Sequence, residues 1–312
     1  MTTSRKLLSI LIFKLLFLAS ILLLFFFSIM PQNEHMYNAA LIEKVKRLET
    51  IDDPKIVLIG NSNAAFGFES QMIEEKFGMP VTNMGMHAAL GNAFHEEMAK
   101  INVTPGDIYI VCHTDYGDED EIGDGVLAWS TIENHAELWQ LLRAKDILPM
   151  LRSYPAYLNK SLDTWSRNKG NRYYRESPYS RESFNIYGDV EYDRNCKWKQ
   201  NESVEEVIPT ISNACENRLN SLNSYLEKKG AKLVIAGYPI IVDGEASEEF
   251  NAQIEEFEKE LEKRFDCEVI SDYRDYFYDK SFFYDTAYHL TNEGAAVRTE
   301  QLIRDLENYF SK

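Results

Sequence analysis

Ser62, Asp285 and His289 are of the residue types that together perform nucleophilic catalysis. Ser62 ends the turn Gly-Asn-Ser, which follows the apolar run from Lys55 to Ile59, and Asp285 and His289 stand four residues apart near the C-terminus. A serine hydroxyl attacks a carbonyl carbon only when a neighbouring base takes its proton, and a third group must orient that base. These residues therefore predict a Ser-His-Asp triad assembled from distant parts of the chain.

Each of these residues also has an ordinary structural explanation. Ser62 could be a helix N-cap, Gly85 a turn glycine at a strand end, and His289 a surface residue in a loop. If a strand at 55–59 leads into a helix, the Ser62 hydroxyl is exposed above the sheet, and free backbone N–H groups can face a developing oxyanion. Gly85 can bring a second bare N–H group close to the same place. The combination of these residues favours catalysis over three separate structural roles.

The same residues carry a resemblance to a known family. Gly60-Asn61-Ser62, Gly85 and the segment from Asp285 to His289 resemble blocks I, II and V of the SGNH (GDSL-like) hydrolase superfamily. The longer stretches 59–68 and 288–294 are similar to a membrane-anchored branch near the DltD and alginate O-acetylation proteins. The resemblance covers the whole domain that follows the N-terminal segment, except for residues 116–203.

The resemblance implies a role for each matching residue. Ser62 would be the nucleophile, His289 the general base and then the general acid, and Asp285 the group that orients His289. The backbone N–H groups of Ser62 and Gly85 would be oxyanion donors. No cofactor or metal is implied.

The chain departs from the superfamily pattern in two places. The third block usually supplies an oxyanion-hole asparagine, but here the third strand ends in Cys-His-Thr-Asp-Tyr at 112–116. Either Asn63 substitutes for that asparagine, or backbone donors act alone. The spacing from Asp285 to His289 is one residue longer than the usual D-x-x-H.

Two other histidines lie near the predicted site. His87 could line the pocket, but a position at the start of a helix explains it equally well. His113 ends the third predicted strand near the same edge, and we do not expect it to be catalytic.

Apolar strand-like runs alternate with amphipathic helical ones, a pattern typical of a parallel sheet. Strands are predicted at 55–59, 80–83, 107–112, 231–236 and 267–270. Helices are predicted at 69–77, 88–101, 204–229, 247–264 and 292–310. The fold class is α/β, a three-layer α/β/α sandwich with a parallel central sheet.

The segment 116–203 interrupts this pattern and is predicted to be an insertion or lid, with helices at 131–144 and 146–158. A lid after the third strand would hang over the same edge of the sheet as Ser62. Its aromatic residues either stack on sugar rings or pack the insertion onto the domain. They are Tyr154, Tyr157, Trp165, Tyr173, Tyr174, Tyr179 and Tyr187.

The N-terminal segment has the features of a membrane anchor. Residues 7–30 are almost entirely apolar and long enough to span a bilayer, whereas the apolar region of a cleaved signal peptide is usually shorter. Because Arg5 and Lys6 precede the apolar run, the N-terminus is predicted to be cytoplasmic and the rest extracytoplasmic. The expected division is a cytoplasmic tip and anchor at 1–31, a stalk at 32–54, containing a short helix at 38–49, and an SGNH-like domain at 55–312.

The net charge and the cysteine positions bear on the binding partners and on disulfide formation. A formal charge of −17 makes nucleic acid an unexpected partner. The acidic residues at 115–124 lack calcium-loop spacing and are expected to be solvated. Cys112 is expected in the core, and a disulfide between Cys196 and Cys215 stays open, because sequence cannot establish connectivity.

Members of the anchored branch typically work beside a multipass membrane acyltransferase on cell-envelope polymers. The resemblance therefore implies a membrane-bound O-acyltransferase or acyl-esterase that acts on an extracytoplasmic glycan or acylated polymer, with such an acyltransferase as its partner. The alternative is a non-catalytic domain that binds glycan or scaffolds the acyltransferase. Retention of Ser62, Asp285 and His289 together argues against that alternative.

Overall fold

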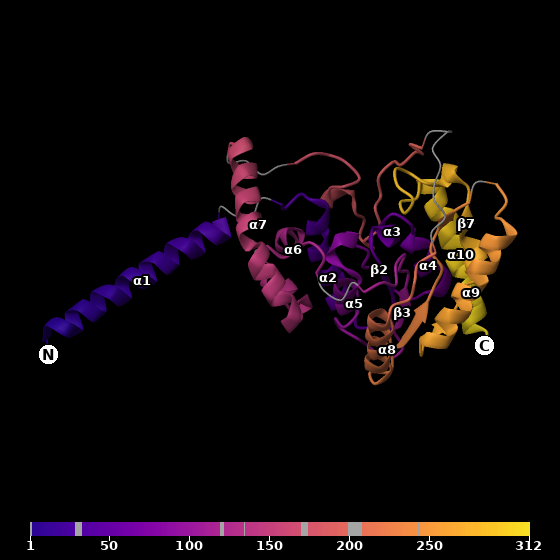
Figure 1. Cartoon of the computed structure of the whole chain (residues 1–312), viewed down its shortest axis with the longest axis horizontal. Coiled ribbons are helices and arrows are strands. Elements are labelled where there is room, and N and C mark those ends of the chain that lie inside the picture. The colour runs from indigo at the N-terminus through magenta and orange to yellow at the C-terminus, as the bar shows by residue number, and fades with distance from the viewer. Residues whose placement is uncertain are drawn as a thin grey trace.

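A parallel five-stranded sheet forms the centre of the domain in the computed structural model of the chain (Figure 1). The structure describes residues 2–28, 33–118, 122–133, 135–169, 174–198, 208–242 and 244–312. The strand order is β2-β1-β3-β4-β6. The strands are β1 (Ile56–Ile59), β2 (Val81–Asn83), β3 (Ile108–Val111), β4 (Lys232–Ile235) and β6 (Glu268–Val269). The α/β class and all five predicted strands are confirmed, each strand being slightly shorter than predicted.

Side chains of the central strands alternate between two hydrophobic cores, one on each face of the sheet. Val57 and Ile59 face the larger core, whereas Ile56 and Leu58 face the smaller one. This alternation explains why the strands read as continuous apolar runs, since both faces are buried. Helices α2 (Leu41–Thr50), α5 (Asn92–Met98), α8 (Asn213–Glu227) and α9 (Glu248–Arg264) contribute to the larger core. Helices α4 (Ser70–Phe77) and α10 (Asn292–Phe310) contribute to the smaller one.

Helix boundaries differ from the prediction where a cap or a glycine intervenes. Helix α8 begins at Asn213, where the Ser212 hydroxyl caps it, and not at 204, which lies outside the described residues. The predicted helix at 88–101 is a 3-10 turn (Ala88–Leu90) followed by α5, because Gly91 between them has a φ of 86°. An L side chain rarely adopts that conformation, so glycine separates the two elements.

Residues 37–50 are part of the domain and not a free stalk. A 3-10 turn (Tyr37–Ala40) leads into α2, whose Leu41, Val45 and Leu48 are buried in the larger core. Lys44, on the same side of α2, is buried as well. The expected stalk at 32–54 is therefore corrected: apolar residues repeating every three to four positions bury this helix against the sheet.

The insertion at 116–203 contains two helices, α6 (Gly125–Ile132) and α7 (Ile147–Arg167). The predicted helix at 131–144 is wrong, because α6 ends at Ile132 and a 3-10 helix (Ala136–Leu141) follows. Helix α7 continues through Pro155 well beyond the predicted end at 158. Short 3-10 turns at Ala144–Asp146 and Arg181–Ser183 complete the insertion among its described residues.

Some aromatic residues of the insertion are buried within it, and others are exposed, where a sugar ring could stack on them. Tyr157 is buried and stacks on Trp129, so it packs the insertion together. Trp165 and Tyr174 are exposed. Tyr173 lies outside the described residues.

A second, two-stranded parallel sheet lies apart from the central one and was not predicted. It pairs β5 (Ile240–Ile241) with β7 (Phe277–Tyr278). Two 3-10 turns flank β7, at Tyr273–Tyr276 and Lys280–Phe282. With only two residues in each strand, these elements carry too little periodicity to be recognised in sequence.

Helix α1 (Thr2–Ser28) projects from the domain (Figure 1). Within it, the stretch Arg5–Leu23 is long and apolar enough to cross a membrane, and none of it is buried. An anchor and a signal sequence would both look like this.

All four cysteines are free thiols in the structure. Cys112 is buried in the smaller core, which confirms its predicted position. Cys196 is exposed and Cys215 is buried, so no disulfide joins them here.

Candidate active site

Ser62, His289 and Asp285 lie in one line of hydrogen bonds at the carboxyl edge of the sheet. The Ser62 Oγ is 2.9 Å from the His289 Nε2, and the His289 Nδ1 is 3.0 Å from the Asp285 Oδ1. The nucleophile candidate thus lies on one side of the imidazole and the carboxylate on the other. This is the geometry in which a histidine accepts a serine proton while a carboxylate fixes its tautomer.

The turn that carries Ser62 is held by side chains on both sides. Ser62 opens the short helix α3 (Ser62–Ala65), whose N-cap is Asn61. The Asn61 Nδ2 donates to the Thr114 Oγ1 at 2.9 Å, which ties the turn to the end of β3. From α10, the buried Arg298 donates to the backbone carbonyl of Asn63 at 2.8 Å. The serine is therefore positioned by two neighbouring elements of the sheet edge.

A closed loop brings Asp285 to His289. Phe283 and Leu290 form an isolated antiparallel bridge, and the Tyr284 N–H donates to the His289 carbonyl at 2.7 Å. Within the loop, the Thr286 hydroxyl accepts from the His289 N–H at 3.1 Å. The extra residue relative to D-x-x-H is thus absorbed by the turn, and the carboxylate still reaches the imidazole.

The imidazole of His289 rests on an aromatic surface. Its ring stacks on Phe66, with centroids 4.2 Å apart and planes inclined by 15°. Phe66 follows α3, four residues after Ser62, so the helix that carries the serine also supports the histidine. The stacking links the orientation of the imidazole to the segment that carries Ser62.

Tyr179 from the insertion completes the site, and the sequence named it only as one of seven aromatic residues. Its hydroxyl donates to the Asp285 Oδ2 at 2.6 Å and lies 3.0 Å from the His289 Nδ1. Since the hydroxyl hydrogen goes to the carboxylate, the Tyr179 oxygen can share the Nδ1 hydrogen with Asp285. No local signal distinguishes Tyr179 from the other tyrosines, because the contact is 106 residues away in sequence.

The pKa values of Asp285 and Tyr179 are shifted in opposite directions. Burial tends to raise the pKa of the Asp285 carboxyl, but hydrogen bonds from His289 and Tyr179 outweigh it, so the pKa is lower than usual. Burial and the neighbouring Asp285 carboxylate raise the pKa of the Tyr179 phenol. Asp285 is therefore ionised and Tyr179 is a neutral donor at neutral pH.

Two of the three predicted oxyanion donors are already occupied. The Gly85 N–H donates to the Asn83 Oδ1 at 2.9 Å. The Asn63 side-chain amide donates to the Asn61 Oδ1 and to the Cys112 carbonyl, and its backbone N–H also donates to the Asn61 Oδ1. This corrects the assignment of Asn63 and Gly85, whose hydrogens are directed into the protein.

The Ser62 N–H is the remaining predicted donor. It is the first amide of α3, a position that has no partner inside a helix. In the part of the chain that the structure describes, no backbone acceptor is found for it.

A buried polar network lies behind Gly85. The Lys44 Nζ donates to the carbonyls of Gly85 and Gly188, at 2.6 and 2.7 Å. The Asp189 carboxylate accepts from Ser70 and from the Asn83 Nδ2, both within 2.8 Å. Burial lowers the pKa of Lys44 to about 7, although Asp189 opposes this. These contacts join the loop after β2 to the end of the insertion.

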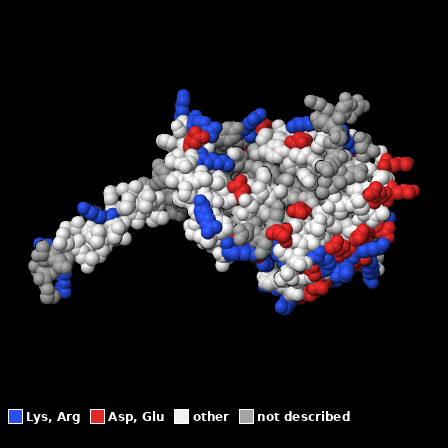
Figure 2. All heavy atoms as spheres, in the orientation of Figure 1, with Lys and Arg blue, Asp and Glu red and all other residues white. Residues whose placement is uncertain are grey.

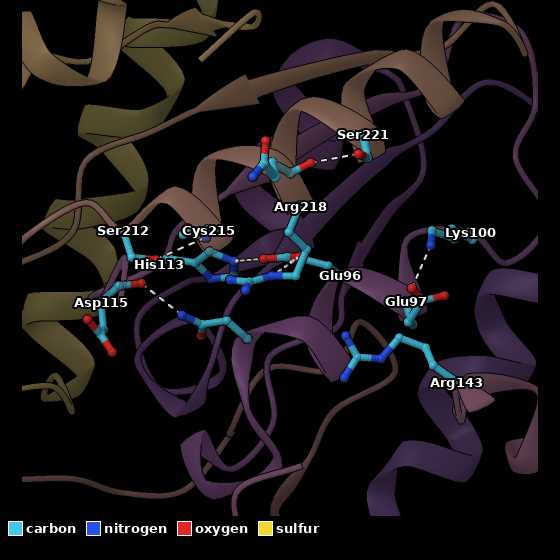
Figure 3. A network of polar contacts seen from close by, with 12 residues as sticks. Glu96, Glu97, Lys100, His113, Asp115, Arg143, Ser212, Cys215, Arg218 and Ser221 are labelled. Carbon is cyan, nitrogen blue, oxygen red and sulfur yellow. Dashed lines mark hydrogen bonds and ion pairs between the residues drawn. The ribbon is translucent and has the colours of Figure 1, made fainter. Parts of the chain in front are cut away.

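Neither His87 nor His113 is hydrogen-bonded to the triad among the described residues, although partial desolvation and the charge of His289 lower the pKa of His87. His87 is exposed and accepts from the Ala89 N–H, which makes it the cap of the following 3-10 turn. His113 is fully buried, and its Nε2 lies 3.2 Å from Glu96, which also pairs with Arg218 (Figure 3). His113 thus contacts Glu96, and its position gives it no contact with Ser62 among the hydrogen bonds of the described residues. No group of three or more metal-ligating side chains occurs in the described ranges.

A cavity of about 540 Å³ adjoins the triad on the side of Tyr179. Tyr192, Tyr284 and Lys197 line it together with Tyr179, and His35, close to the end of α1, forms part of its wall. The lining offers aromatic faces and hydrogen-bonding groups. Such a mixture suits a polar ligand with flat apolar faces, such as a sugar ring.

Comparison with known proteins identifies no relative: no protein-family model, curated protein or solved structure matches this chain.

Proposed function

We propose that this chain is a membrane-anchored serine O-acyltransferase or acyl-esterase of the SGNH type, acting outside the cytoplasm on a cell-envelope or exported glycan. The observation that carries the proposal is the continuous hydrogen bonding from Ser62 through His289 to Asp285. The three residues come from segments more than 220 residues apart. Their meeting in the order required for catalysis supports an enzyme over a scaffold that only binds glycan.

The reaction follows from the roles that these atoms can take. The Ser62 oxygen attacks the acyl carbonyl carbon while its proton moves to the His289 Nε2. The Ser62 N–H stabilises the oxyanion of the tetrahedral intermediate. The intermediate expels the alcohol of the donor ester, which takes the proton from His289, and leaves an acyl-serine. An acceptor hydroxyl then attacks the acyl carbon while His289 takes its proton, and the acyl bond to Ser62 breaks as His289 gives that proton to the serine oxygen. A sugar acceptor gives transfer and water gives hydrolysis.

Three further features support the substrate class and the location. The cavity beside Tyr179 is lined with tyrosines and a lysine, which can stack on a sugar ring and hydrogen-bond its hydroxyls. The apolar helix α1 supports an uncleaved anchor, and Arg5 and Lys6 before it support a cytoplasmic N-terminus. Helices on both faces of the parallel sheet support the three-layer sandwich of the SGNH superfamily. A multipass membrane acyltransferase is the proposed partner and source of the acyl group.

The test is reaction of the full-length chain, in detergent, with a serine-reactive fluorophosphonate and with p-nitrophenyl acetate. We expect labelling at Ser62, located by peptide mass spectrometry, and release of p-nitrophenol. Ser62→Ala should abolish both, and His289→Ala should reduce turnover by about 10³-fold or more.

Two matched controls accompany these variants. Ser311→Ala removes an exposed serine, and His135→Ala removes a partly exposed histidine of the insertion whose partner is Glu137. Both should retain labelling and most of the turnover. A folded wild type that neither labels nor turns over would contradict the proposal and favour the non-catalytic alternative.

A further inference from the structure

Helix α7 of the insertion presents an apolar face to solvent. Ile147, Leu148 and Leu151 are 41, 55 and 59% exposed. They stand at positions i, i+1 and i+4, which share one side of a helix. Trp139, in the preceding 3-10 helix, is 45% exposed. The opposite side of α7 is occupied, since Met150 and Tyr157 are buried in the core, so the exposed face is additional to the one that packs on the domain.

The same helix carries positive charge in an acidic protein. Residues 143–169, which span α7 and the turn before it, contain six Lys and Arg against two Asp, whereas the whole chain has 33 basic against 50 acidic residues. Asp146 and Asp163 pair with Arg143 and Arg167, and four further basic residues lie along this segment. Figure 2 shows basic and uncharged side chains predominating on the end of the domain next to α1, with acidic side chains gathering toward the opposite end. An apolar stripe flanked by Lys and Arg is typical of helices that lie in a membrane interface.

The chain between α1 and the domain is too short to let this helix move far from the end of α1. Asn33 is buried, and its backbone N–H and side-chain amide both donate to Glu133, at the end of α6. Tyr157 of α7 donates to the same carboxylate at 3.3 Å. Only residues 29–32 separate Asn33 from the last residue of α1, a span of at most about 18 Å when extended. In Figure 1, α7 lies at the end of the domain next to α1 and runs across the direction of α1.

We propose that the face formed by Ile147, Leu148 and Leu151 rests on the surface of the membrane that α1 crosses, with the surrounding Lys and Arg side chains on anionic lipid headgroups. The proposal depends on α1 being an anchor, as in the proposed function, but not on catalysis. Lipid fits this face because apolar contact and positive charge occur together on a helix tethered at the bilayer surface. The contact would hold the domain at a fixed orientation, with the cavity beside His35 near the membrane.

The test measures how readily this face reacts with a membrane-impermeant maleimide. The background is the full-length chain with Cys196→Ser, because Cys112, Cys215 and Cys267 are buried. Leu148→Cys reports the α7 face, and Phe310→Cys is the matched control, since Phe310 is 43% exposed near the C-terminus, at the opposite end from α1 in Figure 1. Both proteins are reconstituted in vesicles of phosphatidylcholine and phosphatidylglycerol.

In these vesicles we expect Leu148→Cys to react about tenfold more slowly than Phe310→Cys, and the two to react at similar rates after the vesicles are dissolved in excess detergent. Equal rates in the vesicles would overturn the proposal and leave the face to a protein partner. Flotation of the protein with the vesicles tests the anchor separately, and failure to float would overturn the proposal along with the anchor. Adding Ser62→Ala should leave both maleimide-labelling rates unchanged. The membrane contact can therefore be tested even if the catalytic proposal fails.

Discussion

The edge of the central sheet and the insertion contribute to the same site in different ways. Ser62 and His289 lie directly beside regular elements, after β1 and before α10. Tyr179 comes from residues 174–198, where the only helical element is a three-residue 3-10 turn. The sheet edge holds the atoms that would react, and the insertion supplies a hydrogen bond to the carboxylate behind them.

The two regions are also joined behind the reacting atoms. Lys44 links the Gly85 carbonyl, on the sheet edge, to the Gly188 carbonyl, in the insertion. The Val190 N–H donates to Ala65 in α3 at 2.8 Å. An insertion that makes these contacts is part of the support of the site as well as a cover over it.

Asp285→Asn removes the carboxylate of the triad and should have the largest effect on turnover among these variants. An amide cannot stabilise an imidazolium as a carboxylate does and can favour the wrong tautomer of His289, so kcat should fall by about 10²- to 10⁴-fold. The measurement is turnover of p-nitrophenyl acetate. Asp279→Asn, an exposed cap in the same region, is the control and should stay near wild type. Equal activity of the two variants would remove Asp285 from the triad.

Gly85→Ala tests whether the turn that carries Ser62 tolerates movement. The new Cβ would lie 2.5 Å from the Ala65 nitrogen and 2.9 Å from the Asn61 carbonyl oxygen, both backbone atoms. We expect destabilisation by about 1 to 3 kcal/mol, together with a loss of turnover of at least about tenfold. The measurements are urea unfolding and p-nitrophenyl acetate turnover.

Gly78→Ala is the matched control for that variant. Gly78 has a φ of 64° and open space around its Cα, so alanine there should cost only about 1 to 2 kcal/mol of backbone strain. Its turnover should be unchanged. Similar losses of turnover in both variants would mean that stability alone, and not the position of Ser62, explains the effect of Gly85→Ala.

Tyr179→Phe tests how much the hydrogen bond from the insertion to Asp285 contributes to turnover. It removes the hydroxyl that donates to Asp285 but keeps the ring that packs near Phe66, 5.4 Å between centroids. Losing one hydrogen bond to a charged group should lower kcat/KM by about tenfold. Tyr174→Phe, an exposed tyrosine of the same insertion, should have no effect. If Tyr179→Phe is also silent, the insertion only covers the site.

Lys44→Met tests the link between the two regions through pH. The folded-state pKa of about 7 lies below the ordinary 10.5, so between these values the unfolded chain binds a proton that the folded chain does not. The free energy of unfolding should therefore rise with pH in this window, by up to about 1.4 kcal/mol per pH unit, and Lys44→Met should lose that increase. Urea unfolding from pH 7 to about 9.5 measures the slope. Lys46→Met, exposed on the same helix, should keep it; an unchanged slope in Lys44→Met would contradict a neutral buried lysine.

The regular core was predictable because its signals are local. Five apolar runs gave five strands, and the pattern on α10 gave its bounds to the residue. The stalk was misread because a helix that docks on a sheet and a helix that stands free have the same periodicity. Lys44 on the buried stripe of that helix was an available signal, since a charge there requires partners such as the Gly85 and Gly188 carbonyls.

The oxyanion donors show where sequence reasoning ends. Asn63 has the right chemistry and stands next to Ser62, but its amide is directed at the Cys112 carbonyl, on the neighbouring strand connection. Gly85 has the conformational freedom required, but its N–H is taken by Asn83, two residues earlier. Residue type and spacing give the capacity to donate, and only the folded backbone decides the acceptor.

The sequence by itself determined the parallel α/β core, the apolar N-terminal helix and the identity of Ser62, His289 and Asp285 as candidates, because each depends on a periodic pattern or on reactive residue types. The tertiary structure alone decided that these three residues meet, that Tyr179 joins them and that α7 exposes apolar residues beside the end of α1. The physical reason is the range of the interactions. Strand and helix formation depend on neighbours within a few residues, whereas the hydrogen bonds that bring Ser62 and Tyr179 to the Asp285–His289 loop join residues more than 100 positions apart.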